Sequence, residues 1–184
     1  YFNGISEQDI NLRLANKIKD ELMRDPQLSV TVTRDEQGYI PVIQEYFDES
    51  ETSINRFIES HKKATARALD KEDINLTEQV PHHDAAPVVA YQLYGVNKWA
   101  AENDFDIILN IHFNDDTGHT QKIPGEYAGF TVYVPDENLP NHDDAIIIGE
   151  AIGTRMKQTF PTSTMPLESI KDDENGVIPD FNLI

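Results

Sequence analysis

Apolar residues recur along the chain at two spacings, which predict helices alternating with strands. Near the amino-terminal end they recur every fourth residue, at Ile10, Leu14, Ile18 and Leu22. This spacing places them on one face of a helix. Ser6 is suited to cap that helix, and Asp25-Pro26 is expected to end it. The pattern therefore predicts a helix that begins close to Glu7.

Three shorter runs predict strands. Residues 28–33 alternate and are rich in β-branched side chains, and residues 129–134 alternate and are followed by Pro135. The run Ile107–Ile111 has four aliphatic residues in five and leads directly into His112. Such a run is typical of a strand that is buried on both faces within a parallel sheet.

Helices are expected from Ser53 to about residue 68, from Pro87 to about residue 103, and from residue 141 or 143 to about residue 160. Residues 161–184 show no strong period. Strands separated by helices predict an α/β fold, with a mostly parallel or mixed twisted sheet flanked by helices. We expect one domain over residues 1–184, in which residues 39–87 form a helical and acidic insertion.

Composition narrows the classes of partner. The formal net charge of −18 argues against nucleic acids and anionic membranes, because both would repel such a surface. The chain has no cysteine, which excludes disulfides and thiolate chemistry. It has no run of 18 apolar residues that could span a membrane. The first residues of the sequence do not resemble a signal peptide, which is also what a mature or trimmed product would show.

One residue stands where ligands are often held. A strand that ends in His112 would deliver this side chain to the rim where open α/β sheets bind ligands, although a histidine can also simply cap a core strand. Glu7 falls in the first turn of its helix, where an acidic residue also complements the helix dipole. Three further histidines are more simply explained as solvent-exposed residues than as ligands: the neighbours His82 and His83, and His119 in a loop. His61 is more simply explained as a helix-surface residue.

The order of these motifs resembles that of zinc-dependent N-acetylmuramoyl-L-alanine amidases, which cleave peptidoglycan. The opening stretch Gly4–Leu12, followed by Val30–Asp35, is similar to a helix that begins with a metal-binding Glu and a strand that ends in Thr-Arg. The run from Asp106 to Asn114 is similar to the family's strand ending in Ser-Ile-His-Ala-Asn. The glycine-led strand from Gly129 and the helix after it continue the resemblance.

The resemblance implies an extracytoplasmic enzyme that hydrolyses the amide between muramic acid and L-alanine. Glu7 and His112 would be zinc ligands, and Asn114 would support the site or position substrate. Peptidoglycan would be the substrate, and an activator protein is a possible partner. The helix within the insertion would be a candidate lid over the cleft.

The chain also departs from the family pattern. A further metal-binding His, in a Gly-His-Gly-Gly turn, would lie before Tyr1, and the catalytic general-base Glu would lie beyond Ile184. His82, His83 and His119 are possible replacement ligands that the sequence does not rank. Two alternatives therefore stay open: a non-catalytic peptidoglycan-binding or scaffolding domain on the same fold, and another zinc hydrolase of related architecture.

Overall fold

The computed structural model describes residues 4, 6–70, 86–113, 120, 123, 125–137, 139, 141–166, 168 and 175–180. These residues divide into two compact units. Unit 1 contains the described residues up to 113, and unit 2 contains those from 120 onward. The expectation of a single domain over residues 1–184 stays a prediction.

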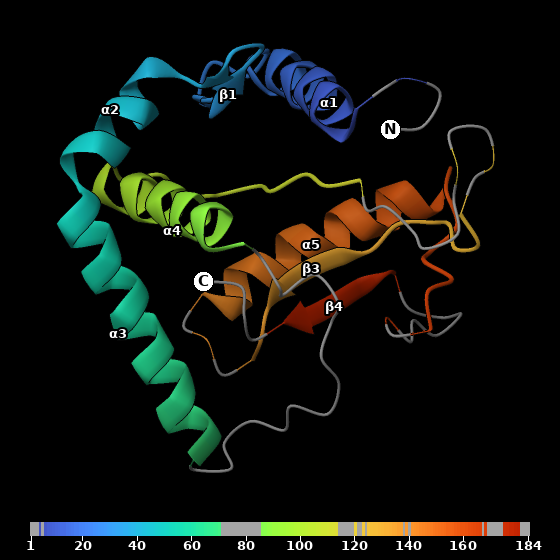
Figure 1. The fold of residues 1–184 in the computed structure, drawn as a ribbon. Coiled ribbons are helices and arrows are strands. Elements are labelled where there is room, and N and C mark those ends of the chain that lie inside the picture. Colours follow the sequence, from blue (N-terminus) through green and yellow to red (C-terminus); the bar gives the residue numbers. More distant parts are fainter. Residues whose placement is uncertain are drawn as a thin grey trace. The chain divides into compact units, whose positions relative to one another are not determined.

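Helix α1 spans Glu7–Leu22 and begins where the sequence predicts (Figure 1). Ser6 is its N-cap, because the Ser6 Oγ accepts a 3.2 Å hydrogen bond from the Asp9 N–H. This bond satisfies one of the backbone donors that a helix leaves unpaired at its start. No residue of α1 is fully buried, and the apolar residue Leu22 is 42% exposed.

The strand predicted over residues 28–33 is wrong. Strand structure begins only at β1 (Arg34–Asp35), which pairs antiparallel with β2 (Gly38–Tyr39). The turn between them is closed by the Asp35 carboxylate, which accepts hydrogen bonds from the N–H groups of Gln37 and Gly38. A β-branched run favours extended backbone, but a strand also needs a partner strand. In the described part of the chain no strand pairs with residues 28–33, and the Thr33 carbonyl alone accepts a hydrogen bond beside the β1–β2 pair, from the Ile40 N–H over 3.1 Å.

The core of unit 1 is built by three helices: α2 (Pro41–Glu49), α3 (Glu51–Asp70) and α4 (Pro87–Glu102). Its buried residues are Ile43, Phe47, Ile54, Val96, Trp99 and Ala100. Gly95 lets α4 approach α2 closely, because a Cβ atom here would lie 2.7 Å from the Phe47 ring. The sequence predicted α3 and α4 but missed α2, and α3 begins at Glu51 rather than after Ser53.

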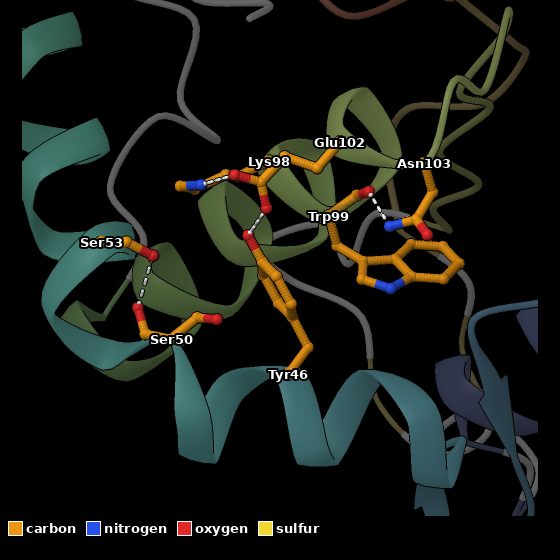
Figure 2. A network of polar contacts seen from close by, with 7 residues as sticks. All are labelled: Tyr46, Ser50, Ser53, Lys98, Trp99, Glu102 and Asn103. Atoms are coloured by element: carbon orange, nitrogen blue, oxygen red, sulfur yellow. Dashed lines mark hydrogen bonds and ion pairs between the residues drawn. The ribbon is translucent and has the colours of Figure 1, made fainter.

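A polar network also ties α2 to α4 (Figure 2). The Tyr46 hydroxyl donates a 2.5 Å hydrogen bond to the Glu102 carboxylate, and the Lys98 ammonium contacts the same carboxylate. Nearer the start of α4, the Tyr91 hydroxyl donates a 2.9 Å hydrogen bond to the Phe47 carbonyl on α2. Polar contacts therefore hold the two helices together at the margin of their apolar core.

The buried strand predicted at Ile107–Ile111 is also wrong. Residues 106–113, which come after α4, form a non-helical segment that has no strand partner in the described part of the chain. Ile107, Ile108 and Leu109 are exposed to 60%, 41% and 52%, whereas Ile111 is partly buried. The apolar character of this segment predicted burial on the assumption that a sheet would form around it. No such sheet forms in the described part of the chain.

Unit 2 contains a parallel pair of strands covered by a helix. Strand β3 (Val132–Pro135) pairs with β4 (Val177–Asp180), with Val132 opposite Val177. Helix α5 (His142–Lys157) packs against both strands. Gly153 permits this approach, because a Cβ atom there would lie 2.3 Å from the Asn175 carbonyl oxygen. The strand predicted over residues 129–134 is observed at Val132–Pro135, so it begins later and includes the proline expected to end it. The predicted helix is observed at His142–Lys157, and β4 lies in a tail for which we expected no element.

The chain is therefore mixed helix and strand, with one antiparallel and one parallel two-stranded sheet in the described residues. The sheets are smaller than the twisted, helix-flanked sheet that the sequence predicts. None of the described helices combines the length and the apolar character needed to cross a lipid bilayer.

Candidate functional site

Unit 1 brings Glu7 and His112 together. The His112 Nδ1 lies 3.5 Å from the Glu7 Oε1, and the N–H of Phe113 donates a 3.1 Å hydrogen bond to the same oxygen. Glu7 is the first residue of α1, whereas His112 lies near the end of the segment that follows α4. Phe113 and Glu7 are separated by 106 positions, so this closeness results from tertiary folding.

A third donor reaches the same carboxylate oxygen from within α1. The Asn11 Nδ2 lies 3.3 Å from the Glu7 Oε1, one helical turn after it. The other polar atom of this side chain, Asn11 Oδ1, is buried and has no hydrogen-bond partner among the described residues. A buried acceptor left unpaired costs about 1–3 kcal/mol. The bond to Glu7 is therefore the interaction that favours this orientation of the amide.

The pair is accessible to a ligand. The side chains of His112 and Glu7 are 61% and 46% exposed, respectively. An exposed carboxylate beside an imidazole supplies one oxygen and one nitrogen donor to the same point in space. These are two of the three donor types with which proteins bind Zn²⁺.

The separation of the two atoms also suits a shared metal ion. Zinc bonds of 2.0–2.2 Å in tetrahedral geometry place two neighbouring ligand atoms about 3.3–3.5 Å apart. The observed 3.5 Å between Nδ1 and Oε1 agrees with this span. The distance is therefore compatible with two neighbouring ligand atoms of one zinc ion.

The described residues do not supply a third ligand. They contain no group of three or more His, Cys, Asp or Glu side chains that could hold a metal ion. Four residues singled out from the sequence lie outside the described part of the chain: His82, His83, Asn114 and His119. Their roles stay predictions.

The other described histidines have structural surroundings. His61 packs edge-on against Phe57, with ring centroids 4.2 Å apart, and near Tyr94. Burial lowers the pKa of His61 below its ordinary value. In unit 2, the His142 Nδ1 lies 2.7 Å from the Pro135 carbonyl and donates to it, which fixes the ring at the start of α5.

Asn11 is the site residue that the sequence analysis missed. The signal was its position four residues after Glu7, which puts both side chains on one helix face.

Comparison of the chain with protein-family models, curated proteins and solved structures finds no match in any of the three.

Proposed function

We propose that this chain is a zinc-dependent N-acetylmuramoyl-L-alanine amidase. The observation that supports this proposal is the contact between Glu7 and His112, the two residues that the family resemblance assigns to zinc. Their order and spacing in the sequence suggested the pairing, and the two side chains meet at a distance suited to a shared ion. The family's α/β fold, in which a larger sheet is flanked by helices, is part of this proposal.

Glu7 and His112 would hold the ion, each through one donor atom. Bound zinc supplies a water whose pKa is lowered to about 7, and it polarises the substrate carbonyl. The hydrolysis breaks the amide C–N bond and adds water across it, leaving the lactyl carboxylate on muramic acid and a free amino group on L-alanine. Asn114, two residues after His112, would orient the peptide or support His112.

The chain's own residues prepare this site in two ways. Helix α1 begins at Glu7, where the positive end of the helix dipole complements a negatively charged side chain. The Phe113 N–H hydrogen bond joins the segment that carries His112 to α1. The proposal includes peptidoglycan as the partner, an activator protein as a second partner, and an extracytoplasmic location.

The metal content of the purified protein, determined by elemental mass spectrometry together with its intact mass, tests the proposal. We expect about one zinc per chain in the wild type and its loss in Glu7→Gln and His112→Ala. Glu59→Gln and His61→Gln are matched controls on α3, and both should retain the metal.

Activity is measured on purified cell-wall sacculi as the release of stem peptides with a free amino-terminal L-alanine. Release by the wild type and its loss in Glu7→Gln would support the amidase. Sedimentation of the chain with sacculi, without zinc and without release, would instead favour the non-catalytic wall-binding domain. Zinc with no release from sacculi but hydrolysis of another amide would indicate a different zinc hydrolase.

A further inference from the structure

Asn11 contacts the Glu7 carboxylate from one helical turn away. It lies inside α1, where asparagine is a weaker helix former than alanine. Its Oδ1 is buried and finds no hydrogen-bond partner in the part of the chain that the structure describes, so the side chain is also poorly satisfied. Both features are unfavourable for folding, and the favourable contact of this side chain is the hydrogen bond that its other polar atom donates to Glu7.

That atom is the Nδ2, which lies 3.3 Å from the Glu7 Oε1. The reverse orientation of the amide would point Oδ1 at the carboxylate, so that two acceptors would face one another. Glu7 therefore dictates the orientation of Asn11, and the unpaired Oδ1 is the consequence. The amide in turn limits the rotation of the carboxylate.

Two donors then fix one oxygen of Glu7 from different parts of the chain. The Asn11 Nδ2 comes from the next turn of α1, and the Phe113 N–H comes from the segment that carries His112. The carboxylate is thereby held in place, although it is 46% exposed and would otherwise sample several rotamers. Outer residues that hold a ligand in this way typically change metal affinity by about 10–100-fold.

We propose that Asn11 is the positioning residue that presents the Glu7 carboxylate to a metal ion. The inference rests on the zinc site proposed above and assigns a role to a residue that would not touch the ion. It also predicts a particular combination of effects. Removal of Asn11 deletes an unpaired buried acceptor and improves helix propensity, so the fold should keep its stability while the metal affinity falls.

The test uses the full chain and Zn²⁺ alone, with affinity measured by competition against a chromogenic chelator. We expect Asn11→Ala and the apolar, similarly sized Asn11→Leu to weaken zinc binding by about tenfold or more. Their melting temperatures without metal should equal or exceed that of the wild type. Asn16→Ala, at an exposed position on the same helix, is the matched control: it brings the same gain in helix propensity and should leave the zinc affinity unchanged.

The visible absorption of the Co²⁺-substituted protein gives a second readout that a purely structural role would not change. We expect the Co²⁺ bands to shift in Asn11→Ala but not in Asn16→Ala. Wild-type zinc affinity in Asn11→Ala would overturn the inference, and so would a parallel loss of stability and affinity in both Asn11 variants.

Variants of the proposed ligands separate this inference from the proposed function. Loss of zinc in Glu7→Gln and His112→Ala, with no change in the Asn11 variants, would leave the metal site standing and remove only the role of Asn11. Unchanged zinc affinity in Glu7→Gln and His112→Ala would overturn the metal site and the inference together.

Discussion

The Tyr46 hydroxyl on α2 donates a 2.5 Å hydrogen bond to the Glu102 carboxylate on α4, and Lys98 contacts that carboxylate from one turn before it (Figure 2). The hydrogen bond from Lys98 is the largest cause that holds the pKa of Glu102 below its ordinary value, and the bond from Tyr46 adds to it. The same pairing raises the pKa of Lys98. The network therefore favours the ionised carboxylate in the folded protein.

Replacement of Glu102 by Gln should lower the free energy of unfolding by about 0.5–1 kcal/mol at pH 7. Because the folded pKa is depressed, this stabilisation is complete above the unfolded-state pKa of about 4.5 and is lost as the pH falls through the folded pKa. The difference between wild type and Glu102→Gln in urea unfolding should therefore vanish in acid. Glu49→Gln, at the exposed end of α2, is the control variant measured over the same pH range.

His61 should make the stability depend on pH in a separate window. Burial lowers its pKa from the ordinary 6.5, so the unfolded chain binds the proton more readily than the folded one. Stability should be unaffected above pH 6.5 and should decrease as the pH falls from 6.5 toward the folded pKa. Thermal unfolding of His61→Gln should lack this decrease, and NMR titration of the ring checks the direction of the pKa shift directly.

Gly95→Ala should destabilise the core of unit 1. The new methyl group would lie 2.7 Å from the Phe47 Cε1 and 3.3 Å from the Ile54 Cδ1, both of which are buried. Overpacking of this kind costs about 1–3 kcal/mol, partly offset by the better helix propensity of alanine. Urea unfolding measures the loss. The double variant Gly95→Ala/Phe47→Leu removes the ring that clashes and should recover part of it.

Gly153→Ala should act on unit 2 instead. Its methyl group would lie 2.3 Å from the Asn175 carbonyl oxygen, which is backbone and cannot move aside as a side chain can. Hydrogen exchange should show loss of protection in β3, β4 and α5, whereas Gly95→Ala should affect α2, α3 and α4. Thr154→Ala, exposed on the same helix, is the control. Equal loss of protection in both units from either variant would contradict the division of the chain into two units.

Sequence patterns anticipated features that depend on neighbouring residues. The cap at Ser6, the start of α1 and the helical face it carries all follow from side chains within one or two turns of each other. Strands were harder to predict, because a strand at residues 28–33 or 107–111 depends on a partner elsewhere in the chain. Strand β4 was missed because Pro179 within it argues against a central strand.

The candidate site could also be predicted only in part from the sequence. The pairing of Glu7 with His112 was suggested by a family resemblance, and their closeness is now an observed distance, although zinc binding stays a prediction. The Asn11 contact could be suspected from its spacing, but the direction of its amide depends on which atoms surround it. That information exists only after α1 and the segment behind His112 have come together.

The exposed segment Ile107–Ile111 has a consequence for how the protein behaves in concentrated solution. Its aliphatic residues combine high β-propensity with no proline and no charge, a composition typical of segments that stack into intermolecular sheets. The net charge of −18 opposes such association, because copies of the chain repel one another at low ionic strength. Salt shortens the range of that repulsion to about 3 Å at 1 M. Aggregation of this protein should therefore be promoted by added salt rather than suppressed by it.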